Sequence, residues 1–365
     1  MADMKTVKLF TNQLAPGMVV AEDVFSYNQQ LIASAGTTID DKLITRFKFY
    51  SINAVSIRVE EDVTASPEAP IGPSETGNSD IVRNTPEFQY YKNAMPKSVK
   101  SLQKEFHSIV TGNVPDQAVL LESVQGMLQQ SRNGIHVFDM IHCLRDYSDE
   151  TYAHCLNVSL ICYVLGNWLG YSKVDLEILT LSGLLHDIGK SVIPQEILTK
   201  PAALSADEYS KVKTHAVRGY DILRPQPIDN RIKLSAMMHH ERCDGTGYPM
   251  NLKGNQIEPF AKIVAIADVY EAMTAARSYR APICPFDVIH LFETEGLAQF
   301  DTHFLMCVLE HLNLTYINSR VRLSDGSEGK IVMMNRFALS RPIVKVGRRY
   351  IDLSLESKIN IDALL

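Results

Sequence analysis

The sequence lacks several features that would place it in particular protein classes. Its 365 residues contain no apolar run near the roughly 20 residues that a membrane helix requires. The six cysteines form no CxxC pair, and we expect reduced, mostly buried thiols rather than disulfides. There is no basic excess either, since the formal net charge is −6. These absences argue against a membrane-spanning protein and against a general attraction to nucleic acid polymers or anionic membranes.

The first residues lack the pattern of an export signal as well. Residues 1–5 have neither the basic start nor the apolar core of a signal peptide. Together with the cysteine usage, this predicts a cytoplasmic protein. The composition, 45% hydrophobic and 21% charged, is typical of a folded soluble protein, and the length allows two or three domains.

Residue patterning divides the chain into four regions. Residues 1–60 predict a small α/β module. Residues 61–85 are rich in Pro, Ser, Gly, Thr and Glu, which predicts a flexible linker, with an ordered loop packed on a neighbouring domain as the alternative. Residues 86–314 are helical in pattern, and residues 315–365 predict a small β-barrel-like tail. The expected fold class is therefore mainly α with two small modules.

The strongest local patterns give expected element positions. In the first region we expect strands at 18–24, 30–33 and 54–59 and a helix at 42–50. In the third region we expect helices at 152–169, 174–186 and 261–276, with Gly189 as a stop after the second. In the last region we expect a hairpin of 321–323 with 330–333, then strands at 343–346 and 350–353.

One set of residues suits a polynuclear metal centre. His239 and His240 are adjacent, His186 and Asp187 stand about fifty residues before them, and Asp268 lies in an apolar helical pattern. Imidazole is the commonest protein ligand of transition metals, and a carboxylate can bridge two ions. Two metals about 3.5–4 Å apart are a recurrent device for cleaving phosphate esters. The set predicts a metal-dependent phosphodiesterase.

Further candidates surround this set. Glu150 and His154 are four residues apart, which places both on one helix face. Lys190 follows His186 by four residues and could meet a phosphate oxygen. His215 falls in a short amphipathic helical pattern at 211–215.

Each candidate also has an ordinary structural explanation. Lys190 could be a cation favoured at a helix C-terminus, and Asp268 could cap a helix or pair with an arginine. A lone Glu150 is more often structural, and adjacent histidines occur on solvated helix ends. The joint occurrence in one helical stretch favours the metal site. The remaining histidines lack such company and are taken as structural: His107, His136, His142, His290, His303 and His311.

These motifs resemble the HD-GYP family, a subgroup of the HD phosphohydrolase superfamily, over about residues 149–312. The matching segments are LLHDIGK at 184–190, ILTKP at 197–201, His215, HHE at 239–241, DGTGYP at 244–249, Asp268 and RSYR at 277–280. The resemblance implies an HD-type helical bundle that hydrolyses cyclic di-GMP to linear pGpG and/or GMP. It also implies two or three divalent metal ions, commonly iron or manganese.

The resemblance further implies roles for individual residues. Asp187 would bridge the ions, and Glu150 matches the glutamate linked to a third metal. The implied metal ligands are His154, His186, Asp187, His215, His239, His240 and Asp268, and the implied substrate contacts are Lys190, Tyr248, Arg277 and Arg280. Two departures stand out. Ser278 replaces a usual proline, which affects the placement of the two arginines, and Glu271 stands where aspartate is frequent.

The chemistry of a phosphodiester explains why such a set is needed. The diester repels hydroxide and its leaving alkoxide is poor, whereas two metals sharing Asp187 and a water lower the pKa of that water and bind the non-bridging oxygens. Lys190 would add positive charge where the transition state accumulates negative charge. Asp187 and Lys190 are therefore the candidate catalytic residues. Arg277 and Arg280 suit a second phosphate or a guanine edge, with a role in surface solubility as the alternative.

Two rival functions follow from the same residues. Another nucleotide phosphohydrolase of the HD superfamily is disfavoured by the Gly247-Tyr248-Pro249 string and the paired histidines. A catalytically weak cyclic di-GMP sensor or interaction protein is disfavoured by the intact ligand set. For residues 1–60 we expect an interaction or scaffold role. Beyond cyclic di-GMP, the partners considered are diguanylate cyclase-type signalling proteins and a second copy of the chain in a homodimer.

Overall fold

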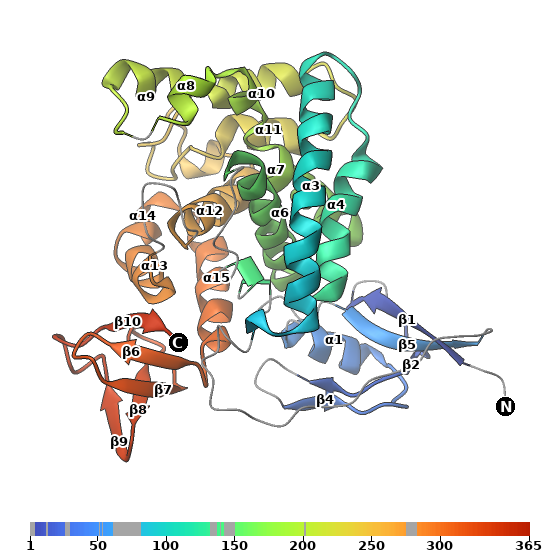
Figure 1. Cartoon of the computed structure of the whole chain (residues 1–365), viewed down its shortest axis with the longest axis vertical. Helices are drawn as coiled ribbons and strands as arrows, with labels where there is room; N and C mark the ends of the chain where they lie inside the picture. Colours follow the sequence, from blue (N-terminus) through green and yellow to red (C-terminus); the bar gives the residue numbers. More distant parts are fainter. Residues whose placement is uncertain are drawn as a thin grey trace.

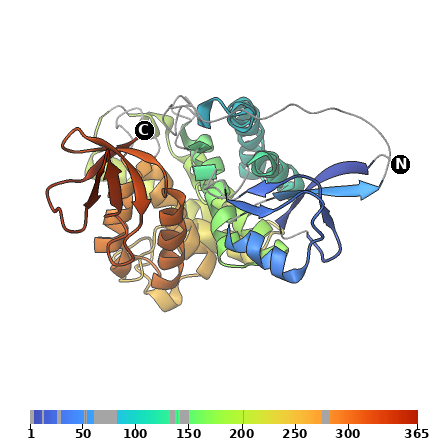
Figure 2. The same cartoon turned by 90° about the horizontal axis from the view of Figure 1, so that it is seen from below.

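The computed structural model is mainly helical, with a small sheet module at each end of the chain (Figure 1). It describes residues 4–11, 14–25, 30–50, 52, 54–60, 82–131, 137–138, 140–141, 150–200, 202–274 and 283–365. Seen from below, the N-terminal and C-terminal modules lie on opposite sides of the helical body (Figure 2). The predicted fold class is confirmed in this coarse form.

The N-terminal module combines short strands with one helix. Its elements are β1 Met4–Phe10, β2 Val19–Val20, β3 Val24–Phe25, β4 Leu31–Ala33, α1 Asp41–Phe49 and β5 Ala54–Glu60. Strand β1, which the patterning did not predict, pairs antiparallel with the full length of β5. The single strand expected at 18–24 is wrong, because β2 and β3 are separate and belong to different sheets.

This module has its own hydrophobic core. Val20, Ile39, Phe47 and Ile57 are among its buried side chains, and they form a cluster distinct from the large core of the rest of the chain. The predicted linker falls mostly on residues 61–81, outside the described residues, and so stays a prediction. Val82, just after that stretch, is buried against the helical body.

The helical body carries the expected long helices. Its elements are α3 Pro86–Val110, α4 Gln117–Gln130, α6 Glu150–Trp168, α7 Lys173–Leu185, η2 Ile188–Val192, α8 Gln195–Leu198, α9 Ala206–Lys213, α10 His215–Leu223, α11 Asn230–Met238, η3 Gly254–Gln256, α12 Pro259–Thr274, α13 Pro285–Leu291, η4 Phe292–Gly296, α14 Leu297–Gln299 and α15 Thr302–Thr315. The segments expected at 152–169, 174–186 and 261–276 are α6, α7 and α12.

Local chemistry explains where the central helices start and why they lie inside. Ser172 caps α7 by accepting from the Asp175 amide, and the Asp175 carboxylate lies at the positive end of the helix dipole. Helices α6 and α12 are apolar on nearly all sides, which suits burial in the middle of the body. Helix α6 packs against both α7 and α12. The polar residues of α6 and α12 therefore need partners inside the protein.

The C-terminal module is an antiparallel sheet in the strand order β10-β6-β7-β8-β9. Its strands are β6 Arg320–Leu323, β7 Glu328–Met333, β8 Ile343–Val346, β9 Arg349–Asp352 and β10 Ile361–Leu364. The predicted hairpin is β6 and β7, whereas β10 was not predicted. Val321, Ile331 and Val344 join the core of the helical body, so this module is packed onto it. Closure of the sheet into a barrel stays a prediction.

The composition led us to expect reduced cysteines and no membrane-spanning helix. Within the described ranges, no helix combines the length and apolar character that a bilayer span needs. The cysteines placed in these ranges carry free thiols: Cys155, Cys162, Cys243, Cys284 and Cys307.

Candidate metal centre

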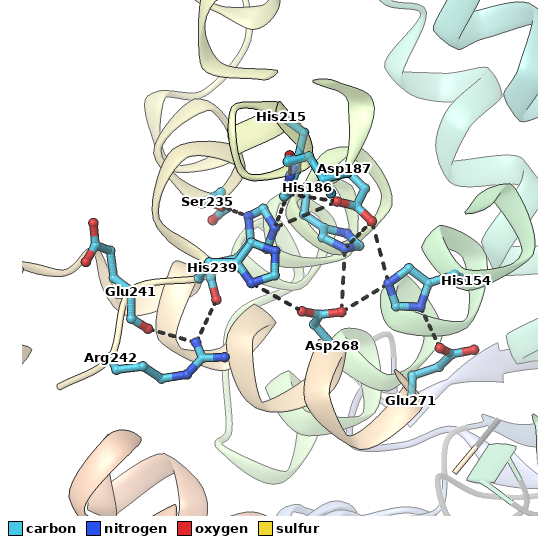
Figure 3. Close-up of polar contacts among 12 residues, drawn as sticks. His154, His186, Asp187, His215, Ser235, His239, Glu241, Arg242, Asp268 and Glu271 are labelled. Carbon is cyan, nitrogen blue, oxygen red and sulfur yellow. Dashed lines mark hydrogen bonds and ion pairs between the residues drawn. The ribbon is translucent and has the colours of Figure 1, made fainter. Parts of the chain in front are cut away.

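Side chains from five helices converge on two buried carboxylates (Figure 3). His154 comes from α6, and His186 and Asp187 follow the end of α7. His215 starts α10, His239 and His240 follow the end of α11, and Asp268 lies within α12. The structure thus brings together seven predicted ligands that are up to 114 positions apart in the sequence.

Asp187 lies between two groups of histidines. Its Oδ1 is 3.3 Å from His215 Nε2 and 3.8 Å from His239 Nε2. Its Oδ2 is 3.4 Å from His186 Nε2 and 3.7 Å from His154 Nε2. We call the first group, His215 with His239 and His240, the His215 end, and the second, His154 with His186, the His154 end. Each end forms with Asp187 a set of ligand atoms close enough to hold one ion.

Asp268 reaches both ends from the opposite side. Its Oδ1 is 3.1 Å from His154 Nε2 and 4.0 Å from His186 Nε2. Its Oδ2 is 4.0 Å from His240 Nδ1. The sequence left open whether Asp268 caps a helix or pairs with an arginine, and in the structure its oxygens face histidine nitrogens, where a bound cation would satisfy the buried carboxylate.

Hydrogen bonds to main-chain oxygens fix the tautomer of three histidines. The Nδ1 atoms of His186 and His215 each lie 2.7 Å from a carbonyl oxygen, of Gly183 and Val212. The Nδ1 of His239 is 3.0 Å from the Ser235 oxygen. A carbonyl can only accept, so each Nδ1 carries the hydrogen and each Nε2 offers a lone pair to the cluster.

The centre of the cluster holds lone pairs that need a cation. The Nε2 atoms of His215 and His239 face each other at 3.3 Å, and Asp187 Oδ1 lies next to both. Asp187 Oδ1 and His186 Nε2 are buried and have no hydrogen-bond partner among the described residues. Unpartnered buried acceptors are unfavourable unless a positive charge lies between them. The residues present therefore fit divalent metal ions.

The protonation states suit the same conclusion. Burial lowers the pKa of His215, and burial with the neighbouring His240 lowers that of His239 further. Burial also lowers the pKa of His240 to about 3. Burial alone would raise the pKa of Asp187, but Lys190 and His186 hold it well below its ordinary value. Neutral imidazoles and ionised carboxylates are the forms that bind metal.

Lys190 brings a cation into contact with the cluster. Lys190 lies in η2, the short helix that follows α7. Its Nζ donates to Asp187 Oδ2 at a distance of 2.5 Å. Burial would lower the pKa of Lys190, but Asp187 raises it above its ordinary value, so the ammonium stays charged. The expectation that Gly189 stops the preceding helix is only part of its role. A side chain at Gly189 would collide with the His215 carbonyl oxygen, so glycine allows η2 to pack against the start of α10.

The loop after His240 places Tyr248 beside the cluster. The Tyr248 ring stacks on the His240 ring, with centroids 4.6 Å apart and planes 25° apart. Glu241, which is buried, holds this loop by accepting from the amides of Met250 at 2.6 Å and Leu252 at 2.9 Å. A side chain at Gly247 would collide with the backbone of residues 240–242, so glycine permits the close return of the loop.

Some predicted site residues cannot be placed. Glu150 opens α6, but its side chain is outside the described part. Arg277 and Arg280 lie in 275–282, also outside the described residues. The interpretation of His215 as part of a helix at 211–215 is wrong, because α9 ends at Lys213 and His215 is the first residue of α10.

The sequence did not reveal the residues that support the ligands. Glu271 entered only as a departure from a frequent aspartate, yet its Oε2 lies 2.5 Å from His154 Nδ1. Asn157 donates to the other oxygen of Glu271. Both residues lie three positions after a predicted ligand on the same helix: Asn157 follows His154, and Glu271 follows Asp268. This spacing was the available signal in the sequence. No such signal marked Glu241 as the residue that holds the Tyr248 loop.

Comparison with known proteins agrees with this geometry. Residues 123–303 match the family model of the HD domain. A 3'3'-cGAMP-specific phosphodiesterase from Vibrio cholerae is 32% identical over 191 residues, 52% of this chain and 36% of that protein. A cyclic di-GMP phosphodiesterase from Pseudomonas aeruginosa is 34% identical over 206 residues, 54% of this chain and 48% of that protein. Another from Thermotoga maritima is 37% identical over 149 residues, 40% of each chain. The chain therefore spans less than half of the length of each of these relatives.

A solved structure extends the likeness to most of the chain. An HDG"Y"P protein from Bdellovibrio bacteriovorus aligns with a TM-score of 0.51 and 15% sequence identity, covering 85% of this chain and 98% of that one. At this identity the likeness shows a shared fold. Together with the family match and the curated relatives, it confirms the resemblance drawn from the motifs: residues 123–303 form an HD domain.

Proposed function

We propose that the chain is a metal-dependent phosphodiesterase that hydrolyses cyclic di-GMP to linear pGpG and/or GMP. The observation that carries the proposal is the position of Asp187, whose two oxygens face two separate groups of histidine nitrogens. A pair of divalent ions bound there would supply a water of lowered pKa and would neutralise the phosphate. The relatives are named for activity on cyclic di-GMP or 3'3'-cGAMP, which supports a cyclic dinucleotide as the substrate.

The residues of this chain have distinct parts in the proposed reaction. His154, His186, Asp187, His215, His239, His240 and Asp268 hold the ions, with Glu150 as a candidate ligand of a third. Lys190 keeps a positive charge beside Asp187 and stabilises the negative charge that grows on the phosphate in the transition state.

Tyr248 is proposed to orient the substrate at the edge of the cluster. Its ring is partly buried against His240, and burial raises the pKa of its hydroxyl, which therefore remains a neutral donor. Arg277 and Arg280 are proposed to bind the second phosphate or a guanine edge, since guanidinium groups bind both in a bidentate manner.

Finer properties belong to the same proposal. We propose iron or manganese as the metal, because imidazole and carboxylate ligands suit both. We also propose a cytoplasmic location, a barrel-like form of the C-terminal sheet, and the four regions 1–60, 61–85, 86–314 and 315–365 as the domain organisation. Diguanylate cyclase-type proteins and a second copy of the chain are the proposed protein partners.

The test follows metal content and turnover together. The full chain, purified without oxygen, is analysed for metal per chain and incubated with cyclic di-GMP, 3'3'-cGAMP and linear pGpG, and the products are separated by chromatography. We expect metal to co-purify and cyclic di-GMP to be consumed. Asp187→Ala should lose both metal and turnover. Cyclic di-GMP hydrolysis that persists in Asp187→Ala would refute the mechanism, and cleavage of 3'3'-cGAMP alone would refute the substrate.

A further inference from the structure

His154 differs from three other histidines of the cluster in what holds its ring. His186, His215 and His239 donate from Nδ1 to main-chain oxygens three or four residues earlier in the sequence. The Nδ1 of His154 instead lies 2.5 Å from Oε2 of Glu271, a carboxylate on α12. The orientation of this one ring therefore depends on a side chain from another helix (Figure 3).

The Glu271 carboxylate is the middle of a longer buried chain of hydrogen bonds. Its Oε1 accepts from Nδ2 of Asn157 at 2.9 Å. Oδ1 of Asn157 accepts from the hydroxyl of Tyr91 at 2.9 Å. Tyr91 is 1% exposed, Glu271 2% and Asn157 7%, so solvent does not compete with these bonds. This series of hydrogen bonds runs from α3 through α6 to α12 and ends at the ring of His154.

Each bond in this chain has a defined direction. Burial, with the charge of Glu271, raises the pKa of Tyr91, so the phenol keeps its proton and donates. Because Tyr91 donates to Oδ1 of Asn157, the amide nitrogen of Asn157 must face Glu271. Glu271 then accepts from Asn157 and from His154, which leaves the Nε2 lone pair of His154 directed at Asp268 and Asp187.

We propose that Glu271, Asn157 and Tyr91 are positioning residues that set the metal affinity of the His154 end. A carboxylate behind a histidine fixes its tautomer and raises its basicity as a ligand. The proposal rests on the proposed function only in taking the cluster as a metal centre. It also gives α3 a part in the site, although Tyr91 lies before the matched HD domain of residues 123–303.

Helices α6 and α12 each carry one proposed ligand and one residue that supports a ligand. Helix α6 carries the ligand His154 and, three positions later, Asn157, and α12 carries the ligand Asp268 and, three positions later, Glu271. A spacing of three places each support on the same helix face as its ligand. Helix α3 contributes no proposed ligand, only the hydroxyl of Tyr91.

The test measures metal affinity rather than turnover. The full chain is stripped with a chelator and titrated with Mn²⁺ by calorimetry and by electron paramagnetic resonance. Glu271→Gln keeps the shape of the side chain but removes its charge. We expect it to weaken one class of sites about 10- to 100-fold and to leave the other class unchanged. Glu271→Asp, which restores the charge on a shorter side chain, should fall between the wild type and Glu271→Gln.

Tyr91→Phe tests the end of the hydrogen-bond series that is farthest from His154, and it has a matched control. Removing this one hydroxyl should weaken the same class of sites roughly 2- to 10-fold, the usual range for one hydrogen bond. The control is Tyr270→Phe, because Tyr270 is the residue before Glu271 and is also buried. This substitution removes a hydroxyl that contacts the hydroxyl of Tyr316. The control should leave both classes of sites unchanged.

Several results would overturn the proposal. Unchanged affinity in Glu271→Gln, or equal weakening of both classes of sites, would remove Glu271 from the role. Equal behaviour of Tyr91→Phe and Tyr270→Phe would remove Tyr91. Thermal unfolding of each metal-free variant shows whether it folds, and if Glu271→Gln does not fold, Tyr91→Phe decides. Normal metal binding without cyclic di-GMP hydrolysis would instead refute the proposed function and leave this inference standing.

Discussion

The two ends of the cluster are built in different ways although they share Asp187. At the His215 end, the rings of His215 and His239 are held by carbonyl oxygens of their own helices. At the His154 end, His186 is held in the same way, but the ring of His154 is held by a carboxylate from another helix. A ligand held by its own backbone needs only the local helix to form. A ligand held by a distant side chain depends on the packing of the whole helical body, so the two ends should respond differently to substitution.

The largest effect is expected from the residue that both ends share. Asp187→Asn keeps the size of the side chain but removes the charge that faces both groups of histidines. We expect loss of metal at both ends, and a fall in kcat of roughly a thousandfold or more, because a metal ion contributes several kcal/mol to such a reaction. Metal per chain and turnover are measured on the same sample. Retention of metal at either end would contradict the shared role.

A pair of substitutions should separate the ends. His239→Ala removes a proposed ligand of the His215 end, and His154→Ala removes a proposed ligand of the His154 end. Each variant should lose roughly one ion per chain and keep the other, since the two ends have different histidines. Titration with Mn²⁺ counts the sites in each variant. Loss of all metal in both variants would mean that the ends are a single cooperative site.

A third change should leave both ends intact and slow the chemistry. Lys190→Ala removes the ammonium that contacts Asp187 but no proposed ligand. We expect metal content near that of the wild type and a fall in kcat of roughly 100- to 1000-fold, typical of losing one group that stabilises transition-state charge. Lys200→Ala is the control, because Lys200 pairs with Glu208 and not with Asp187. A kcat of Lys190→Ala equal to that of Lys200→Ala would exclude the catalytic role.

The smallest effect is expected at the loop outside both ends. Glu241→Gln can no longer accept fully from both Met250 and Leu252, so the loop that holds Tyr248 should loosen. We expect KM to rise more than kcat falls, with a loss of about 1–3 kcal/mol in the free energy of unfolding. Glu258→Gln is the control, since Glu258 also accepts from two amides, at the start of α12. A rise in KM of the same size in the control would contradict a special role of this loop.

The sequence predicted those parts of the molecule that local patterns determine. Helices α6, α7 and α12 were located to within a few residues, because their apolar periodicity is strong. Strands β1 and β10 were not predicted, since each is defined by pairing with a partner far along the chain or across a loop. For the same reason a single strand was expected at 18–24, where the chain in fact contributes to two sheets.

For the site, too, the sequence predicted what local patterns determine and missed what depends on contacts between distant helices. The candidate ligands are residue types with recognisable chemistry, and the resemblance to a known family ordered them. The spacing of three positions after Asp268 was the one local signal for Glu271, and no local pattern marked Tyr91, because both act through contacts between helices. His215 was expected at the end of a helix, whereas α9 ends at Lys213 and His215 begins α10, with its Nε2 3.3 Å from Asp187 Oδ1.

The most direct test of the central claim is anomalous scattering from crystals of the metal-loaded full chain, grown without oxygen. We expect two ions about 3.5–4 Å apart, one at each end of the cluster, with one oxygen of Asp187 facing each ion. A single ion, or ions that do not contact Asp187, would contradict it.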